Sequence, residues 1–244
     1  MSTFRFFILA LALGVLSAAT LAQTPPASPP GQTLHAAPSG ATGDSLLNGG
    51  SAAWVQIPAK RISLNRTPPL FDTDEPAAPE ISTADVRIAR TTGKLVVQLA
   101  WRDVTQDTAT LPQVPNTPPE TRFRKVQTDA DDRFFDAAAV MFPAKSGPDA
   151  MAPSLQMGDA EHPVEIYYWN AARGPMLMEA QGRGTTRRTG QTFPAAAAYQ
   201  NGQWTGTFEL PELSAGTPMA FAVWNGSQKD RDGRKYFSVW QVLE

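Results

Sequence analysis

The sequence contains no cysteine. This absence excludes disulfides, thiolate zinc sites, iron–sulfur ligation by this chain and covalent haem attachment through a C-x-x-C-H motif. Only two histidines occur, His35 and His162, and neither lies in a recognisable catalytic context. The sequence also lacks the serine-hydrolase, phosphate-loop, zinc-protease and dinucleotide-binding motifs. We therefore expect that this chain is not an enzyme by itself.

The sequence also lacks an excess of charge of one sign and a hydrophobic run long enough to span a bilayer. Lys and Arg number 21 against 23 Asp and Glu, which argues against nucleic acid as a partner. The apolar run 6–16 is too short for a membrane span. It follows Arg5 and precedes small residues, a pattern typical of a Sec-type signal peptide over residues 1–22, cleaved after Ala22. This predicts export to the periplasm.

Residues 23–50 are rich in Pro, Ala, Ser, Gly and Thr and have few large apolar side chains. Such a segment buries too little surface to offset the entropy lost on ordering. We therefore interpret it as a flexible tether, in which His35 is solvated.

From Ser51 onward the pattern is that of β-strands. Segments 84–90 and 94–101 alternate apolar and polar residues around a Thr-Thr-Gly turn, and Asn201-Gly202 is a strong hairpin signal. Further strands are expected at 136–142, 164–169, 195–200, 204–210, 219–224 and 237–243. No window shows sustained helical periodicity. The pattern predicts one all-β domain over residues 51–244, an antiparallel β-sandwich with long loops at 103–133, 144–163 and 225–234.

Several segments of this domain carry a family resemblance. They are Trp101-Arg102-Asp103 with Thr105, residues 135–143, the Met157-Gly158-Asp159 turn with the aromatic strand 164–169, residues 202–204, and residues 220–240. In this order and spacing they resemble the haem b-binding gamma subunit of periplasmic molybdoenzymes of the dimethyl-sulfoxide-reductase type. This group includes ethylbenzene dehydrogenase, chlorate and selenate reductases and dimethylsulfide dehydrogenase.

The resemblance implies one non-covalent haem b whose iron is held between a Met thioether and a Lys amine, here Met157 and Lys235. Thioether sulfur is a soft ligand, and an amine ligates iron only after it loses its proton, which burial favours. Lys229, in the same loop as Lys235, and His162, near Met157, remain alternative second ligands.

The same resemblance implies an electron-transfer role. The chain would relay single electrons between the iron–sulfur subunit of a complex with a molybdopterin catalytic subunit and a soluble c-type cytochrome. A second hypothesis is a secreted carbohydrate-binding sandwich without haem. Its stacking platforms would come from tryptophans, namely Trp54, Trp169, Trp204, Trp224 and Trp240.

Overall fold

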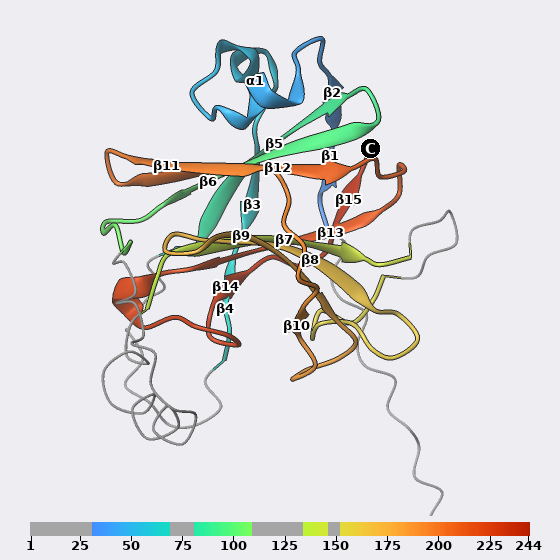
Figure 1. The fold of residues 1–244 in the computed structure, drawn as a ribbon, viewed down its shortest axis with the longest axis vertical. Coiled ribbons are helices and arrows are strands. Elements are labelled where there is room, and N and C mark those ends of the chain that lie inside the picture. The colour runs from blue at the N-terminus through green and yellow to red at the C-terminus, as the bar shows by residue number, and fades with distance from the viewer. Residues whose placement is uncertain (1–30, 69–80, 109–133, 146–151) are drawn as a thin grey trace, which may run out of the picture.

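The computed structural model describes residues 31–68, 81–108, 134–145 and 152–244. Two sheets face each other as the layers of a β-sandwich (Figure 1). The all-β sandwich expected from the sequence is therefore confirmed. Within the described residues, no helix has both the length and the hydropathy needed to cross a membrane. The signal peptide predicted for residues 1–22 lies outside the described residues, as do parts of two expected loops, 109–133 and 146–151.

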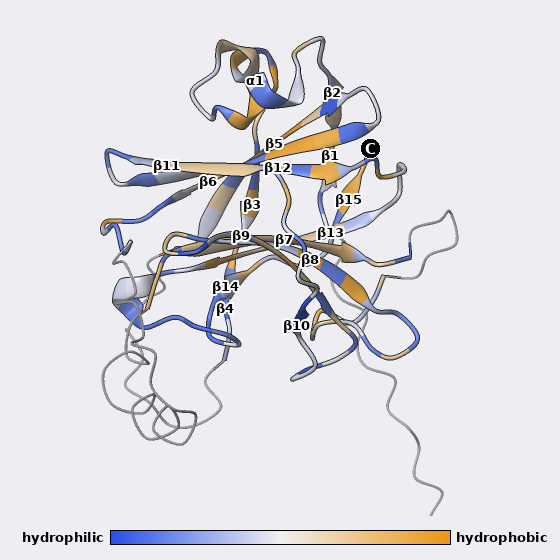
Figure 2. Ribbon diagram, in the orientation of Figure 1, coloured by the Kyte–Doolittle hydropathy of each residue, from blue (hydrophilic) through white to orange (hydrophobic). Residues whose placement is uncertain are grey.

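The first sheet has the order β1-β15-β13-β7-β8-β9-β10, with β14 paired to β13 and β4 paired to β14. Its strands are β1 (Thr33–Leu34), β15 (Gln241–Leu243), β13 (Pro218–Trp224), β7 (Ala137–Pro143), β8 (Val164–Asn170), β9 (Gly174–Ala180), β10 (Arg187–Arg188), β14 (Tyr236–Phe237) and β4 (Asn65–Arg66). Figure 2 shows apolar residues along the strands of both sheets, whereas the loops around β10 and β14 are largely hydrophilic.

The second sheet has the order β11-β12-β6-β5-β2, with β3 paired to β5. Its strands are β11 (Ala195–Gln200), β12 (Gln203–Pro211), β6 (Lys94–Arg102), β5 (Thr83–Thr91), β2 (Ala36–Pro38) and β3 (Lys60–Ser63). Both predicted hairpins, β5–β6 and β11–β12, are confirmed. Asn201 and Gly202 have φ of 52° and 75°, the two positive angles that a type I′ turn requires.

The main core lies between the sheets. Alternate residues of β6, such as Leu95 and Val97, are fully buried there, and β13 contributes Phe221. Because successive side chains of a strand point to opposite faces of its sheet, each strand contributes every second residue to this core. The neighbouring residues of β7, β8 and β13 are also apolar, so the first sheet is hydrophobic on its outer face as well.

The prediction of a flexible tether over residues 23–50 is wrong for residues 31–50, the part that the structure describes. β1 pairs with β15 and β2 pairs with β5, both in parallel, and these edge pairs depart from an otherwise antiparallel fold among the described strands. Helix α1 (Gly43–Leu47) and the 3₁₀ turn η1 (Ala52–Gln56) cover the outer face of the second sheet, where Leu46 and Trp54 are buried. A few well-placed apolar residues are enough to order the segment on an existing sheet. His35 is 72% exposed and pairs with Glu244.

The strand expected at 237–243 is two strands, β14 and β15. Between them the Ser238 hydroxyl accepts a hydrogen bond from the Phe221 N–H, while the Ser238 N–H donates to the Phe221 carbonyl. These two hydrogen bonds hold Ser238 against β13 at the break between β14 and β15. Strand β9 was missed, because its Pro175 weakens the strand signal.

Candidate functional site

The outer face of the first sheet carries a second apolar cluster, here called the outer-face cluster. Its buried members are Ala137, Ala139, Val164, Ile166, Ala180, Ala220, Ala222, Trp224 and Trp240, and its partly buried members are Met141, Leu155, Met157, Tyr168, Met178 and Phe237. Strands β7, β8, β9, β13 and β14 supply the sheet positions, and two loops supply Leu155, Met157 and Trp240. The cluster is separate from the main core, which uses the opposite side chains of the same strands.

Small residues occupy the middle of this face. Ala222 of β13 lies directly opposite Ala139 of β7, and the next pairs are Ala220 with Met141 and Trp224 with Ala137. An alanine projects only a methyl group, so this part of the sheet is apolar and low, with larger side chains beside it. The alanines themselves are buried beneath those larger side chains.

Met157 enters the cluster from a tight turn. Met157 and Gly158 both have positive φ, 73° and 72°. The Gly158 N–H donates to the Ser154 carbonyl at 2.8 Å, and a Cβ on Gly158 would lie 2.5 Å from the His162 carbonyl oxygen. A left-handed conformation costs a non-glycine residue about 1–2 kcal/mol. That methionine adopts it here indicates that the loop holds this side chain in a defined place.

Two further contacts fasten the Met157 loop. The Gly182 N–H donates to the Met157 carbonyl at 2.8 Å, which ties the loop to the chain segment that follows β9. The indole N–H of Trp240 donates to the Pro153 carbonyl at 2.8 Å in a buried position. The loop is therefore anchored from both sides of the cluster.

Lys235 reaches the same cluster from the other end of the face. Its Nζ lies 5.5 Å from the centre of the Trp224 ring. Burial lowers the pKa of the Lys235 amine below its ordinary value, and the positive charge of Arg183 lowers it further, while Asp232 acts in the opposite direction. A lysine with a lowered pKa gives up its proton more readily, which is what ligation of a metal by an amine requires.

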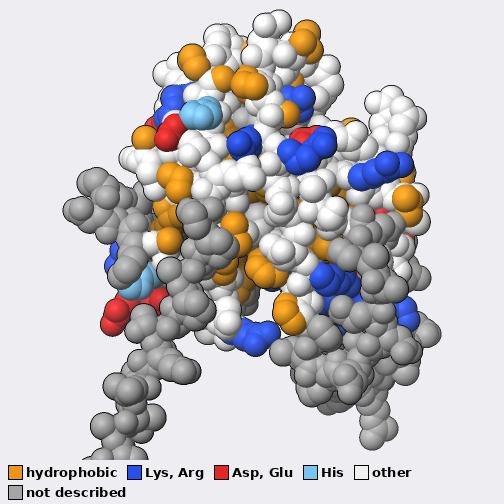
Figure 3. Space-filling view, turned by 180° about the vertical axis from the view of Figure 1, so that it is seen from behind, with side chains coloured by type: hydrophobic (Ala, Val, Ile, Leu, Met, Phe, Trp, Pro, Cys, Tyr) orange, Lys and Arg blue, Asp and Glu red, His pale blue; other side chains and the backbone are white. Residues whose placement is uncertain are grey.

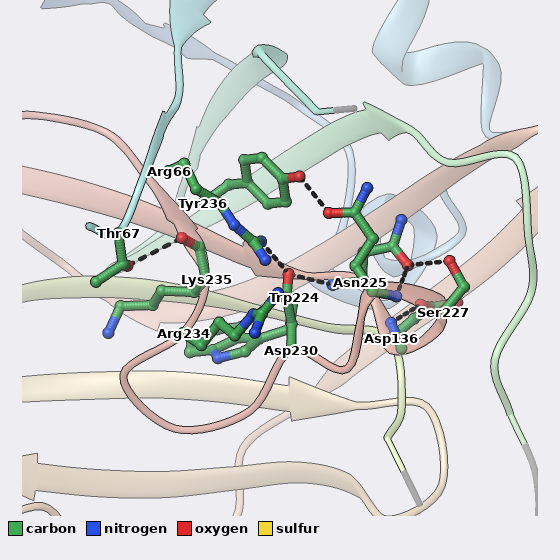
Figure 4. Close-up of polar contacts among 12 residues, drawn as sticks. Arg66, Thr67, Asp136, Trp224, Asn225, Ser227, Asp230, Arg234, Lys235 and Tyr236 are labelled. Atoms are coloured by element: carbon green, nitrogen blue, oxygen red, sulfur yellow. Dashed lines mark hydrogen bonds and ion pairs between the residues drawn. The ribbon is translucent and has the colours of Figure 1, made fainter. Parts of the chain in front are cut away.

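The backbone of Lys235 is held by Thr67. Both the N–H and the hydroxyl of Thr67 donate to the Lys235 carbonyl, each at 2.9 Å. Figure 4 shows the lysine side chain extending away from this contact and from the polar network beside it. The next residue, Tyr236, is buried and pairs with Arg66 of β4. The backbone that follows Lys235 is thus held on both sides, because β14 pairs with β13 and with β4.

A buried ionic contact shapes the loop that precedes Lys235. The Asp230 side chain is fully buried; its Oδ2 lies 2.7 Å from Arg66 Nη1 and accepts from the Asn225 N–H at 3.1 Å (Figure 4). Arg234 Nε lies 3.5 Å from Asp230 Oδ1. Burial raises the pKa of Asp230, and the Arg66 contact opposes that effect. The Asp230 carboxylate therefore links two parts of this loop to each other and links the loop to β4.

Asp136 anchors the start of the same loop. Its Oδ1 accepts from the Gly226 N–H at 2.9 Å, and its Oδ2 accepts from the Asp107 N–H at 2.7 Å and the Trp204 indole at 2.9 Å. Burial raises the pKa of Asp136 against these hydrogen bonds. The three contacts join the loop after β13 to both sheets.

The structure thus brings Met157 and Lys235 to one apolar cluster, although they are far apart in the sequence. The alternatives lie elsewhere. Lys229 is exposed at the end of the 3₁₀ turn η2 (Gly226–Gln228), with φ of 57°. His162 Nδ1 lies 3.1 Å from Asp159 Oδ1 at the back of the methionine turn. No group of three or more His, Asp or Glu side chains forms a metal-ligand set within the described part of the chain.

The five tryptophans considered as carbohydrate platforms are buried, with exposed fractions of 3–8%. Trp169 and Trp204 pack against each other in the main core, and Trp224 and Trp240 belong to the outer-face cluster. None offers an open ring face on which a sugar could stack. Figure 3 shows apolar side chains next to Lys and Arg groups in the lower half of the molecule, the half formed by the first sheet.

This fold and cluster define a β-sandwich with an apolar site on the outside of one sheet. Sequence similarity to known proteins then shows the family. The chain is 30% identical to the dimethylsulfide dehydrogenase subunit gamma of Rhodovulum sulfidophilum, over 76% of this chain and 70% of that protein. It is 27% identical to the chlorate reductase subunit gamma of Ideonella dechloratans, over 98% of this chain and 96% of that protein.

The chain is also 31% identical to a protein of Haloferax mediterranei named as a respiratory nitrate reductase haem subunit, over 78% of this chain. It spans 65% of the length of that protein. No family model matches the sequence. The chain belongs to the family of gamma-type subunits of molybdoenzyme complexes.

Sequence reasoning missed the residues that hold the ligand candidates. Arg66 and Thr67 are neighbours in the sequence, but they lie 164 and 168 residues from their respective partners, Asp230 and Lys235. Short polar residues in loops carry no signal that separates a buried ion pair from a solvated charge. The one local signal available was Met157-Gly158, because glycine after a loop residue is typical of a left-handed turn.

Proposed function

We propose that this chain is a haem-binding electron-transfer subunit of a molybdoenzyme complex, with one non-covalent haem b held by Met157 and Lys235. The observation that carries the proposal is that both side chains lie at one apolar cluster, where burial lowers the pKa of the lysine amine. The relatives named as a haem subunit and as gamma subunits of two such enzymes support it.

The residues present fit such a group. A soft thioether and an amine with a lowered pKa are the two donors, and the alanines of β7 and β13 make the nearby sheet surface apolar. When bound, haem supplies a one-electron couple between ferrous and ferric iron. The chain's part is to hold Met157 in its strained turn, lower the pKa of the Lys235 amine by burial and exclude water with Trp224 and Phe237.

The partners belong to the same proposal. One-electron chemistry on a subunit without catalytic groups is useful only between a donor and an acceptor. We infer that the donor or acceptor inside the complex is an iron–sulfur subunit, next to a molybdopterin catalytic subunit, and that a soluble c-type cytochrome serves outside it. The chain itself would be exported to the periplasm. Sequencing the N-terminus of protein from the periplasmic fraction tests this, with Gln23 expected as the first residue.

The ligands are tested by paired variants of the mature chain. Met157→Leu removes the sulfur at similar volume, and Met141→Leu makes the same change elsewhere in the cluster. Lys235→Gln is compared with Lys229→Gln in the exposed part of the loop. Protein from haem-replete cells should give b-type pyridine haemochrome bands, and only Met157→Leu and Lys235→Gln should lose haem or change its spin state.

Two results would refute the proposal. Absence of b-type bands from the wild-type protein would show that it does not bind haem b. Unchanged spectra in Met157→Leu, with haem still bound, would show that Met157 is not a ligand. For the electron-transfer role, the reduced protein mixed with a c-type cytochrome should be reoxidised rapidly, and failure to react would exclude that carrier.

A further inference from the structure

Arginine side chains border the outer-face cluster on the side of β9 and β10. Arg188 of β10 lies directly opposite Met178 of β9. Directly opposed residues of antiparallel strands project from the same face of a sheet. Since Met178 packs on the outer-face cluster, Arg188 lies on that face too.

Arg183 borders the cluster from the loop after β9. It follows Gly182, whose N–H donates to the Met157 carbonyl at 2.8 Å. Arg183 therefore lies in a loop that is hydrogen-bonded to the backbone of Met157, one of the two proposed iron ligands.

The charge of Arg188 reaches the cluster as well. Burial raises the pKa of the Tyr168 phenol, and the Asn170 hydrogen bond and the charges of Arg173 and Arg188 act against that rise.

Arg183 and Arg188 form no side-chain hydrogen bond or ion pair with another described residue. Their neighbour Arg187 differs, because it pairs with Glu179 at 2.6 Å on the other face of the strand. Two arginines that pair with no other described side chain, beside an apolar cluster, match a ligand with an apolar body and an anionic edge. Arginine is the side chain best suited to pair with carboxylates.

We propose that Arg183 and Arg188 bind the propionate carboxylates of the porphyrin, so that this edge of the outer-face cluster is a carboxylate subsite. The inference rests on the haem site proposed above and adds its orientation. The apolar edge of the macrocycle then lies toward the alanines of β7 and β13, and the carboxylates lie toward β10.

The test compares haem with its dimethyl ester, in which both carboxylates are blocked. The mature wild-type apoprotein should bind haem more tightly than the ester. Each arginine contributes about fivefold, as expected for a partly exposed ion pair. The Arg183→Gln/Arg188→Gln double variant should bind haem and ester equally well. Arg187→Gln, which changes an adjacent arginine on the other face, should keep the wild-type preference.

The outcomes separate the two proposals. If the wild type binds both porphyrins equally, or the double variant keeps the preference, the carboxylate subsite is refuted while haem binding through Met157 stands. If the wild type binds neither porphyrin, the haem site itself fails and the subsite fails with it. Urea unfolding of the apoproteins should give the same midpoint for the double variant and the wild type, because neither arginine has a described partner to lose.

Discussion

The methionine turn offers a sharp test, because one methyl group should disrupt it. In Gly158→Ala the new Cβ would lie 2.5 Å from the backbone oxygen of His162 and 3.3 Å from Val164 Cγ1. Backbone cannot move aside as a flexible side chain can. The His162 carbonyl also accepts from the Asp159 N–H at 3.1 Å, so its displacement weakens that hydrogen bond.

The magnitude follows from two contributions. Alanine at a φ of +72° costs about 1–2 kcal/mol, and loss of a backbone hydrogen bond costs about 1 kcal/mol more. We therefore expect Gly158→Ala to lower the free energy of unfolding by about 2–3 kcal/mol. Gly93→Ala is the matched control, because Gly93 has a φ of +73° and its Cβ would meet nothing within 4 Å. It should cost only the backbone contribution of about 1–2 kcal/mol, so Gly158→Ala should be the more destabilising variant by about 1 kcal/mol.

Both variants are measured as apoproteins by urea unfolding, with the slope of the transition checked against the wild type. Haem uptake is measured in parallel, and Gly158→Ala should reduce it because the Met157 sulfur is displaced. Equal destabilisation in the two variants would refute the reasoning, since the clash with His162 is the only term that separates them.

Three further results are expected. Asp136→Asn should lower the free energy of unfolding by about 2–4 kcal/mol in urea titrations, because one amide oxygen cannot accept all the N–H groups that the carboxylate serves; a loss below about 1 kcal/mol would contradict this. Trp240→Phe should cost about 1–2 kcal/mol by the same assay, because the Pro153 carbonyl loses its buried donor; an unchanged midpoint would contradict it. Burial lowers the pKa of Lys235 in the folded chain, so the lysine destabilises the apoprotein below that pKa and stops doing so as the pH rises to the unfolded value of 10.5. Lys235→Leu should accordingly be more stable than the wild type at neutral pH, and this difference should shrink toward pH 10.5; a difference that stays constant with pH would argue against it.

Much of the fold was readable from local chemistry. Asn201-Gly202 supplies the two positive φ values of a tight hairpin, and alternating residues in 84–101 specify a second hairpin. The composition of residues 23–50 predicts a flexible tether, because composition counts apolar side chains and does not show what they contact. Leu46 is one of the few apolar residues in that segment, yet it is buried on the second sheet beside Trp54 of the next segment.

The candidate site divides in the same way. Family resemblance in the sequence named Met157 and Lys235, and the local pattern of positive φ at Met157-Gly158 is a property of that dipeptide in its turn. The sequence could not rank Lys235 against Lys229, because both are lysines in one polar loop. The structure places the first over Trp224 and leaves the second exposed.

The amino-acid order alone determined the strand pattern, the tight turns and the β-sandwich class, because these depend on side-chain alternation and on backbone angles within a few residues. Tertiary structure alone decided that the same strands carry a second apolar face and that Met157 and Lys235 both lie at it. The physical reason is that burial and charge act through space. A residue's neighbours at 3–6 Å come from strands and loops that the linear sequence does not bring together.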